Sequence, residues 1–416
     1  MIMARVITPK DAYAIMNALV KQATGQTNVA ITDQSGFVSA GETVLATGME
    51  NVINSLNIVL ARSIVASRPY KGKLNLMQAE SNGVYSNRLR KISFYSKEAL
   101  PSGALNTDLF TNLADGYTSG DNNGSSTKSQ WEQHQPIALE MNFGGSSTWQ
   151  DCITMYEHQL QIAFRDESEF ARFVSGYLTE HGNDIEQQKE AFNRMALLNK
   201  IGSTYYLNQA GSVINLTSAY NTAFGTSYTS AQLRTTYLKE FLAFFVSTFK
   251  ECSRFMTERS VRYHWNPQKT VNSVTYDLLR HTPYDRQRVY LYAPLFIEAE
   301  ALVLPEIFNE GYLDLDTQYQ EITYWQGISN RPAINIKPAV IDPSTGQQMA
   351  TAPTVALDYV VGLLVDADGL MTDFMLDRAD TTPMEARKHY RNTWLTIQKN
   401  AIDDPTENAI LFIMAD

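Results

Sequence analysis

Two pairs of aspartates could do chemistry, because each pair places two carboxylates one residue apart. They are Asp314-Leu-Asp316 and Asp366-Ala-Asp368, and such pairs can bind a cation or act as an acid and a base. The apolar run at 360–365 predicts a buried strand directly before the second pair. We therefore expect Asp366 and Asp368 to cap the passage from that strand into a helix, and Asp314 and Asp316 to lie in a solvated loop.

No metal or cofactor site is expected from the histidines and cysteines. None of the histidines has the spacing of HExxH or of another ligand pair. Cys152 and Cys252 lack CxxC spacing and are predicted to be two reduced, buried thiols. The histidines are His134, His158, His181, His264, His281 and His389.

The motifs that hold phosphates or activate nucleophiles are missing as well. The sequence has no GxxxxGK[ST], no GxGxxG and no GxSxG, and Gly144-Gly-Ser-Ser147 does not supply the last of these. We therefore expect a protein that is not an enzyme. The rival interpretation is an enzyme of a mixed α/β class that uses Asp366 and Asp368.

Composition favours a large protein–protein assembly over nucleic-acid or membrane contacts. Of 416 residues, 19% are charged, below the roughly 25% usual for soluble domains, and 22 are tyrosine, which is enriched at interfaces. The net charge is −10, and the densest basic run, Arg88-Leu-Arg-Lys91, is expected to be a solvated edge and not a DNA site. Apolar stretches such as 241–246 are too short to span a bilayer, and Lys10-Asp11 interrupts any signal-peptide pattern.

One long helix dominates the elements that must position these side chains. Apolar residues recur at helical spacing over residues 167–200, which would be about 50 Å long at 1.5 Å per residue. Asp166 offers an N-cap, and Gly202 is the predicted terminator. A lone helix of this length in a mixed chain predicts a spine against which other elements pack.

Residues 88–145 predict a long β-arm. Alternating apolar and polar residues predict strands at 90–97 and at 136–143. Between them the sequence is rich in turn formers, including Ser119-Gly-Asp-Asn-Asn-Gly-Ser-Ser126, and a loop that long is usually functional or mobile. The alternative is a disordered surface insertion.

Shorter elements fill the rest of the chain. Thr229-x-x-Gln232 and Thr382-x-x-Glu385 are capping boxes, and each predicts the start of a helix. Strands at 390–400 and 408–414, joined by a turn at Asp403-Asp-Pro405, are predicted to pair with each other in antiparallel fashion. The other predicted strands are 151–164, 288–293, 321–328, 333–340 and 360–365, the predicted helices are 10–23, 47–62, 216–224, 230–256, 294–304 and 367–375, and the predicted extended arm is 24–45.

The order of these elements resembles the major capsid proteins of tailed bacteriophages, which share the Hong Kong 97 capsid fold, an α+β fold. The resemblance covers nearly the whole chain and depends on the order and spacing of several strings. Leu89-Arg-Lys-Ile-Ser-Phe-Tyr95 is similar to the rising strand of the extended loop (E-loop) of that fold, and residues 164–199 are similar to its spine helix. The other strings are Gly41-Glu-Thr-Val-Leu-Ala-Thr-Gly48, Arg68-Pro-Tyr70, Tyr324-Trp-Gln-Gly327, Val360-Val-Gly-Leu-Leu-Val-Asp366, Thr381-Thr-Pro383, Asn392-Thr-Trp394 and Glu407-Asn-Ala-Ile-Leu-Phe412.

The resemblance implies a division into an N-terminal arm, a peripheral domain, an extended β-arm and an axial domain. The peripheral domain would hold the spine helix and the closing strands, and the axial domain would point toward the five- and six-fold centres of a shell. The expected ranges are 1–45 for the arm, 46–87, 148–215 (with the spine helix at 167–200) and 376–416 for the peripheral domain, 88–147 for the extended β-arm, and 216–375 for the axial domain.

The resemblance also implies a function and partners. The chain would self-assemble as pentamers and hexamers into the icosahedral head shell of a virion, around double-stranded DNA that it does not contact sequence-specifically. Its extended loop would reach across one neighbouring subunit, and its N-terminal arm would clasp another. A separate scaffolding protein and a portal are expected partners, no membrane is, and assembly is expected in the host cytoplasm. An encapsulin-type compartment subunit, which has the same fold and stores an enzyme cargo, is the rival.

Some members of this fold link a lysine of the loop covalently to an asparagine of a neighbour. Lys97, Lys128 and Asn408 are available here, but nothing in the sequence identifies the acid that the reaction needs. We therefore predict no crosslink, so that denatured particles should give the mass of the intact subunit.

Overall fold

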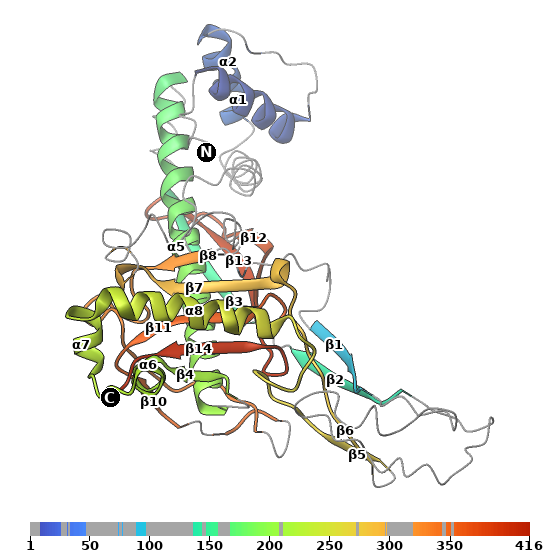
Figure 1. Ribbon diagram of the computed structural model, residues 1–416. Coiled ribbons are helices and arrows are strands. Elements are labelled where there is room, and N and C mark those ends of the chain that lie inside the picture. Colours follow the sequence, from blue (N-terminus) through green and yellow to red (C-terminus); the bar gives the residue numbers. More distant parts are fainter. Residues whose placement is uncertain are drawn as a thin grey trace. The chain divides into compact units, whose positions relative to one another are not determined.

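The computed structural model of the chain (Figure 1) describes residues 9–25, 31, 34–46, 74, 77, 89–96, 136–143, 147–156, 167–207, 211–271, 274–295, 297, 319–342, 347–350 and 353–416. Helices and strands are mixed along these residues, as an α+β fold requires. The chain divides into two units, each made of three separate stretches. Unit 1 comprises Met1–Lys73, Ser146–Phe192 and Phe374–Asn400, and unit 2 comprises Leu74–Gly145, Asn193–Asp373 and Ala401–Asp416.

Two short helices, α1 (Pro9–Thr24) and α2 (Gln34–Ala46), pack against each other in unit 1. The ring centroid of Tyr13 in α1 lies 6.1 Å from that of Phe37 in α2. The helix expected at 10–23 is therefore confirmed as α1.

The extended arm expected at 24–45 is wrong, because α2 occupies most of it. Phe37, Ala40 and Val44 are buried, and spacings of three and four residues put them on one side of a helix. Burial of this side against α1 outweighs the low helix propensity of the glycines and serines in the segment. The helix expected at 47–62 lies outside the described residues.

A three-stranded sheet in unit 1 has the order β12-β13-β3. Leu395 of β13 lies opposite Asp151 of β3, and Ile397 lies opposite Trp149 in the same antiparallel pairing. Leu395 and Ile397 pack with Ile185 of the long helix α5 (Glu167–Leu207) into a small apolar core, so one face of this sheet is covered. The strands are β3 (Ser147–Tyr156), β12 (Leu370–Thr381) and β13 (Tyr390–Asp403).

The helices expected at 367–375 and from Thr382 onward are wrong, because both segments belong to the β12–β13 hairpin. Strand β12 follows a tight turn in which the Gly369 amide donates to the carbonyl oxygen of Asp366 at 2.9 Å. At the other end of the hairpin, the hydroxyl of Thr382 accepts from the Asn392 amide at 3.1 Å. Side chains that cap helices also stabilise turns, so the capping pattern did not distinguish the two outcomes.

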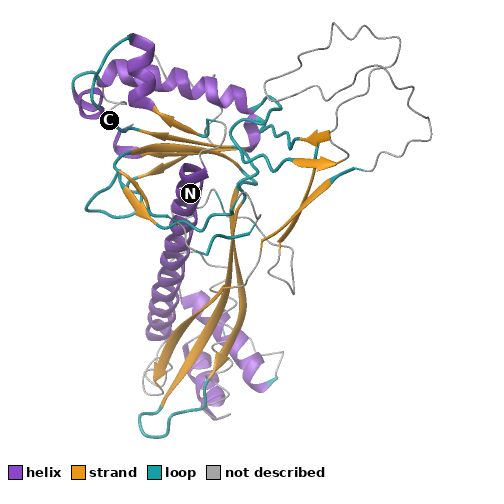
Figure 2. Cartoon of the chain, turned by 90° about the horizontal axis from the view of Figure 1, so that it is seen from below, coloured by secondary structure: helices purple, strands orange, loops and turns teal. Residues whose placement is uncertain are grey.

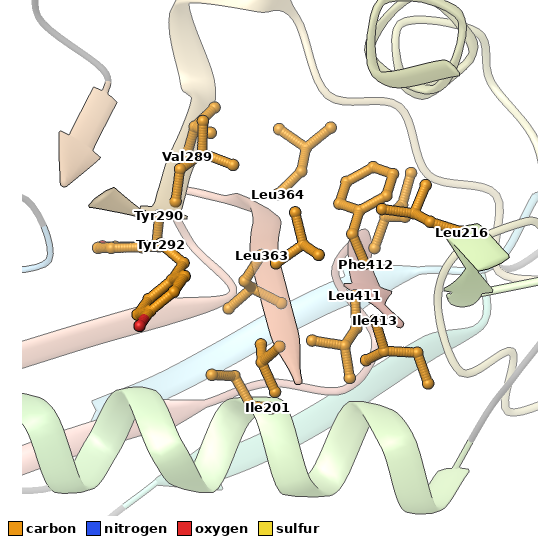
Figure 3. Packing of buried hydrophobic residues seen from close by; sticks show 14 of the residues in the cluster. Ile201, Leu216, Val289, Tyr290, Tyr292, Leu363, Leu364, Leu411, Phe412 and Ile413 are labelled. Carbon is orange, nitrogen blue, oxygen red and sulfur yellow. The ribbon is translucent and has the colours of Figure 1, made fainter. Parts of the chain in front are cut away.

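A five-stranded sheet forms the centre of unit 2, with the order β4-β14-β11-β7-β8. Every residue of β11 and β14 is buried, and because successive side chains of a strand point to opposite faces, both faces of this sheet are covered. Phe412 of β14 lies 5.6 Å from Phe245 and 5.8 Å from Phe249 of helix α8 (Leu238–Met256), measured between ring centroids. Figure 3 shows Ile201 of α5 on the side of Leu411, away from Phe412. The strands are β4 (Val213–Asn215), β7 (Gln287–Tyr292), β8 (Tyr319–Ile322), β11 (Val360–Asp366) and β14 (Ala409–Ile413).

The antiparallel pairing expected between 390–400 and 408–414 is wrong, because the two strands lie in different sheets. Strand β13 pairs with β3, whereas β14 pairs antiparallel with β11 and parallel with β4. The continuous apolar run of β14 suits a sheet that is covered on both faces. Buried residues in β13 largely alternate with more exposed ones, which suits a sheet with one covered face.

The long helix is confirmed and is longer than expected. Helix α5 (Glu167–Leu207) has 41 residues, about 60 Å at 1.5 Å per residue, and Figure 2 shows it as the long, unbroken purple helix. Gly202 does not end it. A Cβ at Gly202 would lie 2.8 Å from Ile336 Cδ1 and 2.9 Å from Pro338 Cβ, so the glycine permits another segment to approach the helix closely.

Two short helices have capped N-termini, and the capping box predicted at Thr229 and Gln232 is confirmed. Asn215 caps α6 by accepting from the Thr217 amide, and the Thr229–Gln232 capping box opens α7. The single helix expected at 230–256 is instead two, α7 and α8, with Tyr237 outside helical geometry at their junction. The helix expected at 294–304 lies mostly outside the described residues. The remaining elements are α6 (Leu216–Phe224), α7 (Ser230–Thr235), α8 (Leu238–Met256), a 3-10 turn at Tyr284–Arg286, β1 (Leu89–Phe94), β2 (Ala138–Phe143), β5 (Lys269–Val271), β6 (Val274–Tyr276), β9 (Ile334–Ile336) and β10 (Val355–Leu357).

Candidate functional site

Strands β1 and β2 form the antiparallel hairpin predicted at the start and end of the β-arm (Figure 1). Lys91 lies opposite Met141, and Ser93 lies opposite Leu139. The turn-rich segment between the strands lies outside the described residues. Ser93 is 5% exposed, and its two neighbours in sequence are exposed, because alternate residues of a strand face opposite ways.

The ammonium group of Lys91 lies between two carboxylates of unit 2. Its Nζ is 2.5 Å from Asp404 Oδ2 and 2.5 Å from Glu407 Oε1. The side chains of Asp404 and Glu407 are 0% and 9% exposed, and that of Lys91 is 25% exposed. A charge-assisted contact of this kind joins β1 to the segment between β13 and β14.

A second cation, Arg280, joins the same two segments. Its Nη2 donates to the Ser93 hydroxyl at 2.7 Å and lies 3.3 Å from Glu407 Oε1. Its Nε donates to the Thr406 carbonyl oxygen at 3.0 Å. We call Lys91, Arg280, Asp404, Thr406 and Glu407 the hairpin network.

Asp404 is held on its other side by its own turn and by α5. Its Oδ1 accepts from the Thr406 amide at 2.8 Å and from the Thr406 hydroxyl at 2.7 Å. Lys200 of α5 donates to the Asp404 carbonyl oxygen at 2.7 Å and forms an ion pair with Asp403 at 3.1 Å. Asp404 thus connects the hairpin to α5 through one buried turn.

Burial and charge shift the pKa values of the network in different directions. Burial opposes the charge of Lys91, but Asp404 and Glu407 outweigh it and raise the pKa of Lys91. Burial would raise the pKa of Asp404, but the Lys91 charge and the hydrogen bonds from Lys91 and Thr406 hold it below its usual range. Burial dominates at Glu407 and raises its pKa, against the attraction of Lys91 and Arg280. Of the two counter-ions of Lys91, Asp404 therefore keeps its negative charge to lower pH.

The network was not expected from the sequence, and the solvated edge expected at Arg88-Leu-Arg-Lys91 is wrong for Lys91. Its ammonium faces the protein because it lies on the same side of β1 as the buried Ser93. The turn expected at Asp403-Asp-Pro405 is present. An aspartate two residues before a threonine is a turn signal, but nothing local identifies a lysine more than 300 residues away as its partner.

The Asp366 and Asp368 carboxylates have different partners. Asp366 is buried and accepts from the Thr282 hydroxyl at 2.7 Å and from the Asp368 amide at 2.8 Å, whereas the Asp368 carboxylate pairs with Arg286. Asp366 caps a turn and not the helix that was expected. Asp314 and Asp316 lie outside the described residues.

Asn408, the asparagine considered for a crosslink, is 2% exposed. Its amide nitrogen donates to the Thr282 hydroxyl at 3.1 Å, and its oxygen lies 3.2 Å from His264 Nδ1. Both ends of the side chain therefore have partners within the same unit. Lys97 and Lys128 lie outside the described residues. Cys252 is buried, as expected, but Cys152 is exposed on β3.

A small cavity lies beside the hairpin network. A cavity of about 20 Å³ beside Lys200, His264 and Glu407 has space for about one water molecule. Within the described ranges, no three His, Cys, Asp or Glu side chains gather as metal ligands would. Of the helices in those ranges, none has both the length and the apolar character needed to cross a membrane.

Comparison with known proteins finds one capsid-protein family and structures from phages. Residues 16–413 match the family described as Phi29-like phage major capsid protein. The capsid structure of Staphylococcus phage Andhra is similar, with a TM-score of 0.51 and 11% identity over 83% of this chain and 85% of that one. A structure of the head fiber and inner core protein gp22 of native bacteriophage P68 gives a TM-score of 0.49 and 11% identity over 82% of this chain and 84% of that one. No curated protein matches.

Proposed function

Because this chain belongs to the Phi29-like phage major capsid protein family, we propose that it builds the icosahedral head shell that encloses a phage's double-stranded DNA. It is a shell-forming major capsid protein of the virion, and its fold is the Hong Kong 97 type that the resemblance implied. The observation that carries this conclusion is a family match that spans residues 16–413. The family and fold indicate a structural and not a catalytic role, and an enzyme that uses Asp366 and Asp368 is not favoured.

The finer proposal is that pentamers and hexamers of this chain form the shell. The division into an N-terminal arm, a peripheral domain, an extended β-arm and an axial domain stays a prediction. The β1–β2 hairpin is the base of the extended arm, which we propose to lie against a neighbouring subunit. The outward face of the hairpin supports this, because Ile92 and Phe94 are 49% and 59% exposed and a neighbour would remove them from water.

We also propose what the shell encloses and which proteins assist its assembly. A net charge of −10 suits a container that confines DNA without gripping its phosphates. We expect a separate scaffolding protein and a portal as partners, and assembly in the cytoplasm of the bacterial host.

Electron microscopy of the purified protein tests the shell. We expect closed icosahedral particles, and from infected cells DNA-filled heads with one portal vertex. Particles that contain an enzyme cargo and have no portal vertex would instead favour the encapsulin-type alternative. A protein that stays monomeric under all assembly conditions would refute both.

Substitution of the exposed pair tests the neighbour contact. Ile92→Ser with Phe94→Ser should abolish assembly, while circular dichroism and melting of the subunit stay unchanged, because both side chains face solvent in the single chain. The conservative pair Ile92→Val and Phe94→Leu should still assemble. Normal shells from the serine variant would show that this face is not an interface.

A further inference from the structure

We propose that the β1–β2 hairpin is a releasable element that a polar lock, centred on the ammonium group of Lys91, fastens to the rest of unit 2. The inference concerns a single chain and does not depend on the proposed function. It means that the hairpin can detach from Arg280, Asp404 and Glu407 while the five-stranded sheet stays folded.

The first argument is the lack of apolar anchoring. Among the side chains of β1 and β2 whose burial the structure describes (91–94, 138–141 and 143), no apolar one is buried, and none belongs to the core of unit 2. Ser93 is the buried residue of the pair, at 5% exposure. Apolar burial is the main force that holds one element against another, so the hairpin relies on a different kind of contact.

The second argument is the nature of the contacts that remain. Lys91 reaches Asp404 and Glu407, and Ser93 receives a hydrogen bond from Arg280. Where β1 ends, the Ser96 amide donates to the Asp277 carbonyl oxygen at 2.9 Å. Polar contacts of this kind depend on short distances and good alignment. The hairpin is therefore expected to occupy two states, one in which these contacts are made and one in which they are broken.

The third argument is that release leaves few buried groups unsatisfied. Asp404 keeps both hydrogen bonds from Thr406, and Glu407 keeps Arg280. The Lys91 side chain is already 25% exposed and enters solvent when it leaves. The two strands keep their own pairing from Leu89–Phe143 to Phe94–Ala138. A released state is thus accessible without disruption of the sheet.

Hydrogen–deuterium exchange of the full-length, unassembled chain tests the lock. An isolated two-stranded hairpin is marginally stable in water, so each release should let the β1 amides exchange. In the unmodified chain the amides of β1 and of Ser96 should exchange faster than those of β11, by at least about 100-fold, and with little dependence on low urea. Exchange of β1 and β11 through one common opening would overturn the inference.

Variants of Lys91 provide a second hydrogen–deuterium exchange test. Lys91→Met should speed exchange at Ser96 and in β1 by a further tenfold or more, with β11 still exchanging more slowly than β1, whereas Lys91→Arg should have a smaller effect because it keeps the charge. The matched control is Lys189→Met, which removes a partly exposed ion pair with Glu186 in unit 1 and should leave β1 exchange unchanged. If Lys91→Met leaves exchange in β1 and at Ser96 unchanged, the hairpin is not locked as proposed. The urea series on the unmodified chain decides the question if the variant does not fold.

Discussion

Asp404→Asn is the most informative single change to the hairpin network, because it removes one charge and alters almost no volume. Asp404 is fully buried, and its two oxygens accept from different partners, Lys91 on one side and Thr406 on the other. An amide has a single acceptor oxygen, so its NH₂ group must face either the Lys91 ammonium or the two donors of Thr406. Both orientations place donor against donor in a buried position.

The expected loss of unfolding free energy is about 3 kcal/mol. Breaking a buried ion pair by removal of one partner costs about 3–5 kcal/mol, and we take the lower end because Lys91 keeps Glu407 at 2.5 Å. A loss of 3 kcal/mol lowers the folding equilibrium constant roughly 150-fold. Urea unfolding of the unassembled subunit, followed by tryptophan fluorescence and circular dichroism, measures this directly.

Glu407→Gln is the matched control for this prediction. Burial raises the pKa of Glu407, so its ionised form is already disfavoured, and the oxygen of glutamine still accepts from Lys91. We expect a loss below about 1 kcal/mol, the net worth of an ordinary hydrogen bond. Equal losses in the two variants, or a loss below about 1 kcal/mol for Asp404→Asn, would refute the assignment of Asp404 as the main counter-ion of Lys91.

Two further predictions concern the same unit. The first is a stability that changes direction with pH. Because the pKa of Glu407 is raised above 4.5 in the fold, its contribution grows as pH falls toward 4.5. The pKa of Asp404 is held below 3.8, so its contribution is lost as pH falls through that lower value, and that of Lys91 is lost only as pH rises above 10.5. The other charged or titratable groups around these carboxylates are Arg280, Lys200, Asp403 and His264. Urea unfolding between pH 3 and pH 8 tests the two contributions separately: Asp404→Asn should remove the loss of unfolding free energy at low pH, and Glu407→Gln should remove the gain toward pH 4.5. A pH profile identical to that of the unmodified chain in both variants would contradict this account. The second is that Gly202→Ala costs about 1–3 kcal/mol, because its Cβ would lie 2.8 Å from Ile336 Cδ1. Gly225→Ala, at a helix C-cap with φ of 64° and open space around it, should cost about 1 kcal/mol through backbone strain alone, and a Gly202→Ala variant as stable as the unmodified chain in thermal melts would disprove the close approach.

Local patterns were enough to predict the elements whose signals are strong and continuous. The apolar spacing over 167–200 predicts α5, because a helix of that length repeats its pattern over many turns. The Thr229–Gln232 capping box predicts the start of α7, because both of its hydrogen bonds join residues three apart. The run at 360–365 predicts β11, because only a strand with both faces covered is apolar at every position.

Contacts between distant residues decided the rest. Residues 370–381 form β12 and not a helix because β13 offers a partner strand, and pairing within a sheet overrides local propensity. Strands β13 and β14 follow each other in sequence, yet they enter different sheets, one with a single covered face and one with two.

The hairpin network shows the same division between sequence and structure. The sequence by itself determined that β1 and β2 would be strands, and that a turn would follow Asp403. It did not determine that Lys91 would face inward or that Asp404 and Glu407 would receive it, because those partners are 313 and 316 residues away. Only the tertiary structure brings Lys91 Nζ to 2.5 Å from each of the two carboxylates. Burial at that distance allows a lysine from a basic run to fasten β1 to the rest of unit 2.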